Sequence, residues 1–317
     1  MRKTYIFLFL LIDTLCMFGQ GPYWLYDSHY LTDKYIINPA FAGSQYYPKT
    51  FIGTQRMEMQ MSDAPAVHLV GAHSRLGIRK NYTNKYRFND RQARNAIGGL
   101  MFADINGPFQ AIGIKLDYAY SVPLSGEFTL SFGLGGMLFS KKLRLDNYNS
   151  PTYDPLIAES MGNKVIIPDF NAGIVLSRNQ FYAGFSAAQL FENSFQFSKY
   201  SYAPAQVYRN YFLLTGYRFV YDRFELEPSF VAGHNFAPKS HANSGNYVDI
   251  NVEFFVKPIV ILLSYRINGF ITTSFLYRAE KLEFGIRLEQ FSTNSSNAPF
   301  NSIGFMISYT FLPSDKR

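Results

Sequence analysis

The sequence contains almost no cysteine or tryptophan, and after its first residues it has no long apolar run. There are 1 Cys and 1 Trp in 317 residues. If Cys16 is removed with an N-terminal leader, the mature chain has no thiol, which excludes disulfide bonds and thiolate metal or redox sites. No stretch beyond the N-terminus reaches the roughly 18–20 apolar residues that a membrane-spanning helix needs. We therefore do not expect a helical membrane protein.

Acidic residues are also relatively few, with 23 Asp and Glu against 30 Lys and Arg, so the formal net charge is +7. The basic residues are dispersed except for one concentration between residues 79 and 94. This concentration fits either contact with an acidic surface, such as lipid headgroups or a partner, or an ordinary solvated loop. Nucleic acid is not an expected partner of an exported chain.

Aromatic residues are abundant, with 24 Tyr and 31 Phe, and many lie in alternating segments. Residues 302–311 place apolar side chains at odd positions and small or polar ones at even positions, apart from Met306. Such a strand needs an apolar environment on one face and a tolerant one on the other. Similar segments predict about 14 strands, at residues 50–61, 65–77, 95–104, 109–121, 127–141, 167–177, 180–190, 206–219, 222–233, 247–256, 258–267, 270–278, 281–290 and 301–311.

Alternation alone fits a soluble sandwich as well as a barrel, but the connections separate the two folds. From the fourth strand onward, tight turns alternate with long polar loops, and the long loops fall on one side of a meander. This asymmetry is typical of bacterial outer-membrane proteins. We therefore predict an all-β fold, an antiparallel up-and-down transmembrane β-barrel of outer-membrane type, with a bulge at Pro228. The long connection at residues 78–94 means either that the second and third strands are misdrawn or that a basic loop extends into the periplasm.

Four segments are expected along the chain. Arg2, Lys3 and the apolar residues 5–12 predict a signal peptide at residues 1–19, with a lipid-modified Cys16 as the alternative. Residues 20–49 do not alternate, so they are an N-terminal segment that forms a turn into the first strand, a plug in the lumen or a docking segment for a periplasmic partner. The barrel is expected at residues 50–311. A C-terminal tail follows at residues 312–317.

Charges of both signs occupy positions predicted to face the lumen. Two signs in one narrow space favour a cross-linked interior over a strongly ion-selective pore, and about 14 strands neither require nor exclude a plug. The positions are Lys115, Asp117, Asp169, Arg218, Arg223, Glu225, Glu227, Asp249, Glu253, Arg266, Arg278, Lys281, Glu283, Arg287 and Glu289.

No catalytic constellation is expected, so we predict that the chain is not an enzyme and has no cofactor or metal site. The five histidines are dispersed, and His68 and His73 would face opposite sides of a strand. A barrel phospholipase would need neighbouring Ser and His side chains, and no such pair can be assigned from the sequence.

Several short motifs follow one another along the chain. The most specific is Asn38-Pro39-Ala40-Phe41-Ala42-Gly43, which precedes Gln55-Arg56 and the turn formed by Asp104, Gly107 and Pro108. Together, across roughly residues 20–311, they resemble the PorP/SprF family of type IX secretion system membrane proteins. Later matches are Tyr118-Ala119-Tyr120, Pro168-Asp169-Phe170-Asn171-Ala172-Gly173-Ile174, Phe181-Tyr182-Ala183-Gly184, Gly216-Tyr217-Arg218, Glu227-Pro228-Ser229 and Ser264-Tyr265-Arg266.

The resemblance implies an outer-membrane barrel of Bacteroidota that works in type IX protein secretion. Its implied partners are other type IX components, or the C-terminal domain of a secreted surface protein such as a gliding-motility adhesin, together with outer-membrane lipid. The alternative function is a porin-like solute channel. The last predicted strand also resembles the insertion signal that the barrel-assembly machinery reads, through Gly304, Ile307, Tyr309 and Phe311.

Overall fold

The computed structural model describes ten stretches of the chain, residues 29–44, 47–57, 64–76, 94–106, 109–143, 163–195, 205–236, 245–267, 269–291 and 301–311. The predicted signal peptide with Cys16, the C-terminal tail, most of the basic residues between 79 and 94, and the turn residues Gly107 and Pro108 lie outside these stretches. The described residues contain no helix long and apolar enough to cross a membrane.

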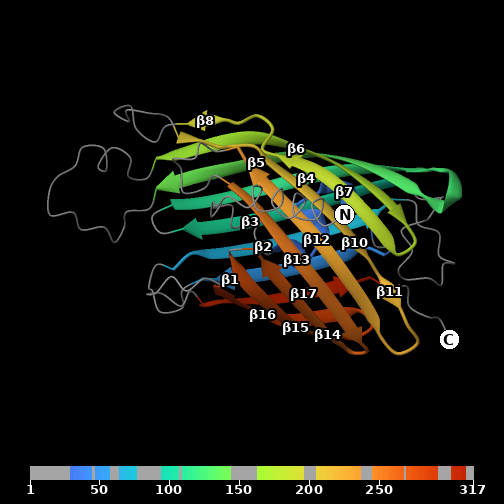
Figure 1. Ribbon diagram of the computed structural model, residues 1–317. Helices are drawn as coiled ribbons and strands as arrows, with labels where there is room; N and C mark the ends of the chain where they lie inside the picture. The colour runs from blue at the N-terminus through green and yellow to red at the C-terminus, as the bar shows by residue number, and fades with distance from the viewer. Residues whose placement is uncertain are drawn as a thin grey trace, which may run out of the picture.

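The described strands form one antiparallel barrel (Figure 1). Fourteen strands make up its wall, because the two-residue β11 continues the line of β10. They are β1 (Lys49–Arg56), β2 (Ala66–Arg75), β3 (Asn95–Asn106), β4 (Phe109–Pro123), β5 (Thr129–Leu143), β6 (Lys164–Arg178), β7 (Phe181–Ala188), β10 (Asn210–Tyr217) with β11 (Phe219–Val220), β12 (Glu225–Asn235), β13 (Gly245–Val256), β14 (Ile259–Arg266), β15 (Phe270–Arg278), β16 (Leu282–Phe291) and β17 (Asn301–Thr310). Strands β8 (Ser194–Phe195) and β9 (Ala205–Gln206) pair separately between β7 and β10.

Each wall strand pairs with its neighbours in sequence, and the first strand pairs with the last. Lys49 of β1 faces Thr310 of β17, and Arg56 faces Ile303 at the other end of the same ladder. The circle continues through the pairing of β10 with β12. The predicted antiparallel up-and-down barrel is therefore confirmed, and no wall strand leaves an open edge in lipid.

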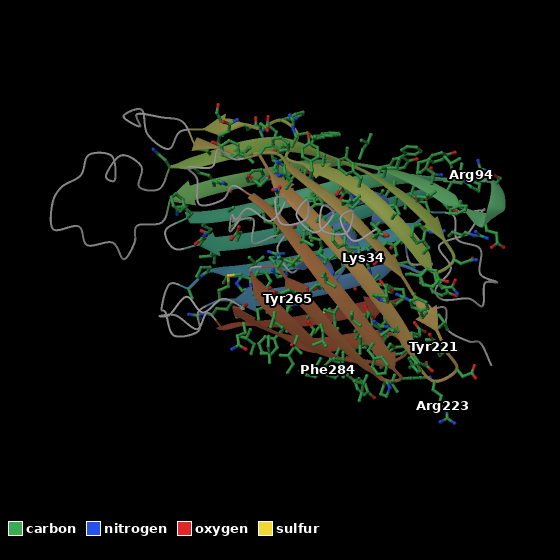
Figure 2. The ribbon with its side chains drawn as sticks, in the orientation of Figure 1. Lys34, Arg94, Tyr221, Arg223, Tyr265 and Phe284 are labelled. Carbon is green, nitrogen blue, oxygen red and sulfur yellow. The ribbon has the colours of Figure 1, made fainter. Side chains whose placement is uncertain are left out.

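The two faces of the wall differ as the alternation predicts. In β17, Phe305 and Ile307 are 54% and 51% exposed on the outer face, whereas Met306 and Ser308 are buried in the lumen. Tyr265 and Phe284 project from the outer surface in the same way (Figure 2). Large apolar side chains on the outer face suit contact with hydrocarbon.

Two details of the predicted strands are wrong. Pro228 of β12 causes no bulge. The pairing of β12 with β13 has no extra residue. On its other side, β12 pairs with β10 through Gly216–Ser229 and with β11 through Phe219–Leu226, and no residue is inserted between these two pairs. Instead, the missing N–H interrupts the ladder locally, which separates β10 from β11 without an extra residue. Arg223 does not face the lumen, since it lies exposed in the turn before β12. The second and third strands are drawn correctly, since Arg75 pairs with Ala96.

The two edges of the barrel carry different connections. One edge has the turns that join β4 to β5, β6 to β7, β11 to β12, β13 to β14 and β15 to β16, together with the start of β1 and the end of β17; we call it the short-turn edge. Arg94, Tyr221 and Arg223 lie at this edge (Figure 2). The opposite edge carries the longer connections after β5, β7, β12 and β16.

Residues 29–44, which we call the lumen segment, lie inside the barrel (Figure 1). They form three 3-10 turns, η1 (His29–Leu31), η2 (Lys34–Ile36) and η3 (Pro39–Phe41). A fourth turn, η4 (Ser125–Glu127), joins β4 to β5. The described contacts of the lumen segment reach strands on opposite sides of the wall, so it crosses the interior.

Candidate functional site in the barrel lumen

Asn38 is the residue that fixes the turn of the Asn-Pro-Ala-Phe-Ala-Gly motif. Its Oδ1 accepts a hydrogen bond from the Ala40 N–H at 2.9 Å, and Pro39 occupies the first position of η3, where no N–H is needed. Its Nδ2 donates to the backbone carbonyls of Ile174 at 3.3 Å and Phe185 at 3.2 Å. One side chain therefore caps η3 and attaches it to β6 and β7.

Three glycines of the wall give the backbone of this turn room to approach. A Cβ at Gly133 would lie 2.2 Å from the Ala40 N, and a Cβ at Gly173 would lie 2.1 Å from Asn38 Oδ1. At Gly184 it would lie 3.0 Å from Asn38 Nδ2. We call these three residues the glycine floor. Any side chain at Gly133 or Gly173 would displace the turn.

Asp33 holds the other end of the lumen segment. It caps η2 by accepting from the Tyr35 N–H at 3.0 Å, and its Oδ2 lies 2.9 Å from Lys49 Nζ and 3.1 Å from His73 Nε2. The Gly43 N–H donates to His73 Nδ1 at 3.1 Å. Because Nδ1 accepts from Gly43, the hydrogen-bond network assigns the Nε2 proton to the bond with Asp33. His73 thus bridges two turns of the lumen segment.

The wall also satisfies backbone carbonyls within the segment. Lys115 Nζ lies 3.2 Å from the Ile36 carbonyl and 3.5 Å from Asp117 Oδ2, and it sits 4.6 Å from the centre of the Tyr35 ring. The Tyr35 hydroxyl donates to Asp117. The Ser186 hydroxyl donates to the Ile37 carbonyl at 2.7 Å. These bonds replace the water that the carbonyls lose on burial.

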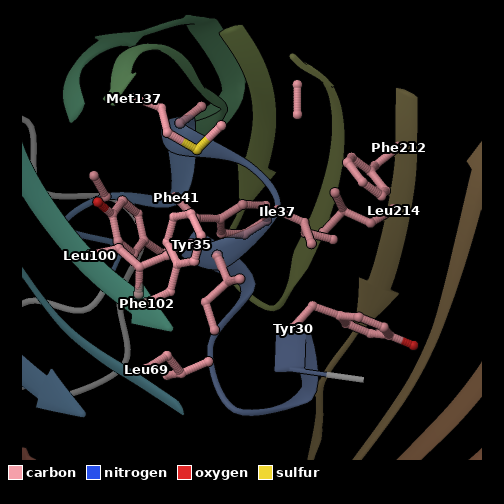
Figure 3. Packing of buried hydrophobic residues seen from close by; sticks show 14 of the residues in the cluster. Tyr30, Tyr35, Ile37, Phe41, Leu69, Leu100, Phe102, Met137, Phe212 and Leu214 are labelled. Atoms are coloured by element: carbon pink, nitrogen blue, oxygen red, sulfur yellow. The ribbon is translucent and has the colours of Figure 1, made fainter. Parts of the chain in front are cut away.

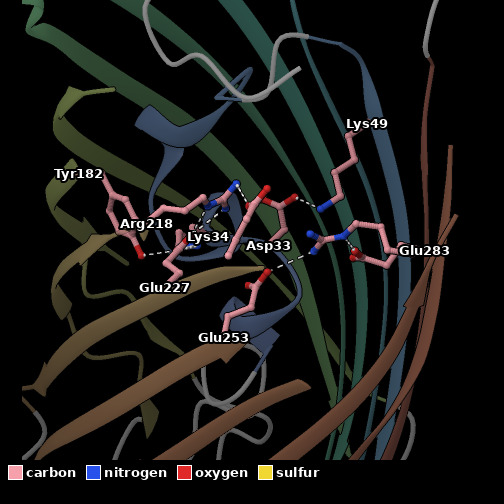
Figure 4. Close-up of polar contacts among 10 residues, drawn as sticks. Asp33, Lys34, Lys49, Tyr182, Arg218, Glu227, Glu253 and Glu283 are labelled. Carbon is pink, nitrogen blue, oxygen red and sulfur yellow. Dashed lines mark hydrogen bonds and ion pairs between the residues drawn. The ribbon is translucent and has the colours of Figure 1, made fainter. Parts of the chain in front are cut away.

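Lys34 joins a network of charges on the opposite wall (Figure 4). Its Nζ lies 2.9 Å from Glu227 Oε1, while Arg218 Nη2 lies 2.6 Å from Glu227 Oε2. The Tyr182 hydroxyl donates to Glu227 at 3.0 Å, and the Tyr182 ring meets Phe41 edge-on at 5.7 Å. The predicted cross-linking of lumen charges of both signs is confirmed here.

Further polar contacts attach the segment to β13 and β16. The Tyr30 hydroxyl donates to Asp249 Oδ2 at 2.7 Å, and Arg266 Nε lies 2.6 Å from the other oxygen of that carboxylate. Arg287 Nη2 donates to the Thr32 hydroxyl at 2.9 Å. The segment is thus attached to β13 and β16 as well as to β1, β2, β4, β6, β7 and β12.

The half of the lumen lined by β1 to β7 and β10 is an apolar core (Figure 3). Tyr35, Ile37 and Phe41 of the lumen segment are at most 2% exposed and belong to one cluster with inward side chains such as Leu100 and Phe212. Full burial of a side chain of this size contributes roughly 1.5–3 kcal/mol of stabilisation relative to leaving it exposed to water. Apolar packing therefore adds to the polar contacts that the segment makes with the same strands and with the opposite wall.

Burial and ion pairs shift the pKa values of the segment's titratable groups. Burial disfavours ionised Asp33, but the Lys49 ammonium and His73 outweigh it and hold the pKa of Asp33 well below its usual range. Burial, with Arg287 and His68 adding to it, lowers the pKa of His29 to about 3. Neutral His29 and ionised Asp33 therefore favour the docked segment at neutral pH.

We expect the lumen segment to loosen as the pH falls. The pKa of His29 is lowered, so its contribution is complete above the usual value near 6.5 and declines as the pH drops towards about 3. Between pH 7 and 4.5 this linkage amounts to roughly a 100-fold increase in the undocked population. Asp33 adds a further loss below about pH 4, because its usual value lies there. Hydrogen exchange of residues 29–44 should show the effect, and His29→Phe should remove the part above pH 4.5; an unchanged profile in that variant would contradict the assignment.

The residues of the family-like motifs and of the predicted insertion signal fall into separate groups in the structure. Residues Asn38 to Gly43 lie together in the lumen, but Arg56 ends β1 on the outer face and Asp104 faces the lumen from β3, away from the glycine floor. In the predicted insertion signal, Gly304 faces inward, whereas Ile307, Tyr309 and Phe311 are exposed on the outside. Those aromatic positions suit contact with lipid or with assembly machinery, and this role stays a prediction.

Sequence reasoning missed Asp33, Lys34 and His73 as anchoring residues, as well as the glycine floor. Asp33 precedes η2 at an N-cap position, as Asn38 does before η3, so a capping search could have found both. Glycines inside strands also mark close backbone approach. Within the described stretches, no group of three or more His, Cys, Asp or Glu side chains could hold a metal ion.

Comparison with known proteins gives one family and several barrels. A family model described as type IX secretion system membrane protein PorP/SprF matches residues 20–311. No curated protein matches the sequence. The CymD monoaromatic hydrocarbon channel shares 12% identity at a TM-score of 0.48, over 93% of this chain and 95% of that one. The TodX monoaromatic hydrocarbon channel deltaS2 mutant shares 9% identity at a TM-score of 0.46, over 90% of this chain and 94% of that one. The NanC porin shares 7% identity at a TM-score of 0.42, over 83% of this chain and 100% of that one.

Proposed function

Because the chain belongs to the PorP/SprF family of type IX secretion system membrane proteins, we propose that it is an outer-membrane barrel that anchors or helps to deliver a secreted surface protein, or that holds envelope-spanning machinery. The family match over residues 20–311 carries this proposal. In this proposal a signal peptide at residues 1–19 exports the chain, and the partners are other type IX components or the C-terminal domain of the secreted protein.

The filled lumen supports a docking role over that of a solute channel. Residues 29–44 are attached to β1 and β2 through Asp33, to β6 and β7 through Asn38, and to β12 through Lys34. In this proposal the lumen segment is a plug, because a chain held by buried ion pairs and an apolar core does not leave the wall readily. The long connections on one edge, whose central residues lie outside the described stretches, provide the surface for the secreted partner.

We expect a tagged copy, purified from native membranes after cross-linking, to enrich type IX components or a secreted protein over a tagged unrelated barrel. A deletion strain should fail to display that secreted protein on the cell surface, as measured by surface proteolysis. Recovery of the barrel alone, together with normal secretion in the deletion strain, would rule the proposal out.

A further inference from the structure

Three polar side chains form one row on the outer face of β4, β5 and β6, which are neighbours in the wall (Figure 1). Lys142 of β5 pairs in register with Gln110 of β4 on one side and with Lys164 of β6 on the other. Side chains that face each other across a ladder have Cβ atoms only about 4.5–5.5 Å apart. None of the three makes a hydrogen bond or an ion pair within the described part of the chain. The row therefore offers several hydrogen-bond donors to a ligand.

The two lysines of this row carry like charges directly opposite each other, an arrangement that destabilises a sheet. On the described strands β3 to β6, no Asp or Glu lies on the outer face to offset them, because Asp104, Asp117 and Asp169 all face the lumen. Lys164 is exposed, so an anion can reach it from outside the barrel. An anion between the two ammonium groups would replace their repulsion by two attractions.

The row lies where the apolar outer face of these strands ends. One outward position closer to the short-turn edge, Ile112 of β4 and Ile166 of β6 are 52% and 61% exposed and flank the smaller Ser140 of β5 in register. From Ile112 to Tyr120, every outward side chain of β4 is apolar or aromatic, as suits contact with hydrocarbon. Lysines at the end of such a face can lay their stems on it and reach the lipid headgroups.

We propose that Lys142 and Lys164 bind the phosphate of a membrane lipid in the leaflet at the edge opposite the short-turn edge. The two ammonium groups pair with phosphate oxygens through charge-assisted hydrogen bonds, and Gln110 donates one more. An acyl chain of the same lipid lies over Ser140, between the two flanking isoleucines. A lipid is the occupant rather than free phosphate, because the row adjoins the hydrocarbon-facing surface. This site is separate from the lumen segment and does not depend on the proposed role in secretion.

The test measures binding of dioleoyl phosphatidic acid, whose headgroup is a single phosphate, to the full-length barrel in detergent micelles by native mass spectrometry. Binding should weaken about fivefold in Lys142→Gln or Lys164→Gln, and at least about twentyfold when both lysines are replaced. Lys257→Gln is the matched control, because this exposed lysine lies in the turn between β13 and β14 at the short-turn edge. Its effect should stay below about twofold, because it lies apart from the row.

A further variant separates lipid binding from a purely structural role of the lysines. Lys142→Glu places opposite charges across the ladder, so it should lose the lipid although the barrel unfolds at no lower urea concentration than the unchanged protein. Assembly of each variant is checked by its heat-modifiable migration on gels, and the single variants are compared if the double variant does not assemble.

Dioleoylglycerol, which lacks the phosphate, should bind the unchanged barrel as weakly as phosphatidic acid binds the double variant. Equal binding of the two lipids would overturn the lipid-phosphate site, and so would equal binding of phosphatidic acid by the double variant and the unchanged barrel. Displacement of the lipid by inorganic phosphate at the same concentration would also overturn it, because the occupant would then be free phosphate.

Discussion

Replacing Gly133 and Gly173 together by valine should expel the turn that carries Asn38 from the lumen while the barrel still assembles. A Cβ at either position would lie 2.2 Å or less from an atom of that turn. Gly133 and Gly173 pair with each other across β5 and β6, so the ladder holds the backbone that would carry the new side chains. Overpacking of this kind costs about 1–3 kcal/mol per site. We expect limited proteolysis to cut residues 29–44 at least about tenfold faster than in the unchanged protein, with the fragments identified by mass spectrometry.

The matched control for this experiment lies on the same strand. Gly136 of β5 faces outward, and a Cβ there would have only an ordinary contact at 3.9 Å with the Phe170 ring. Gly136→Val should therefore leave the cleavage rate unchanged. Full protection of residues 29–44 in the double valine variant would show that the glycine floor does not determine the position of the turn.

Deleting residues 29–44, the proposed plug, should give a barrel that conducts ions. Without the segment, Asp249 and Glu227 lose Tyr30 and Lys34 but keep Arg266 and Arg218, whereas the ammonium of Lys49 loses Asp33. These charged groups then face solvent in the lumen. A 14-stranded wall then encloses a space somewhat narrower than the aqueous channels of 16-stranded porins. We expect steady single-channel currents in planar bilayers for the deletion variant, and assembly is checked by heat-modifiable migration.

The fold could be predicted well from the sequence because the membrane makes alternation directly informative. Most outer positions of the strands are apolar, so the period of two persists from Phe109 to Thr310 and locates nearly every strand within a few residues. The strand expected at residues 270–278 is β15 without change. The bulge at Pro228 was wrong because a missing donor can be tolerated as a gap in the ladder.

The arrangement inside the lumen could be predicted only in part. The Asn-Pro-Ala-Phe-Ala-Gly motif stood out because it breaks the alternation, but nothing local links Asn38 to Gly173, far along the chain. Nothing local links Asp33 to His73 either, because their hydrogen bond depends on how residues 29–44 enter the barrel. Lumen charges were recognisable by position, yet their partners within residues 29–44 follow from tertiary structure alone.

The conductance of the intact protein tests most directly whether residues 29–44 close the barrel. The purified full-length protein and the deletion variant are inserted into the same planar bilayers at the same pH, near 7, where His29 is neutral and Asp33 is ionised. We expect no steady open pore from the intact protein and a steady pore from the deletion variant. A steady open pore of similar conductance in the intact protein would contradict a plugged lumen and favour a solute channel.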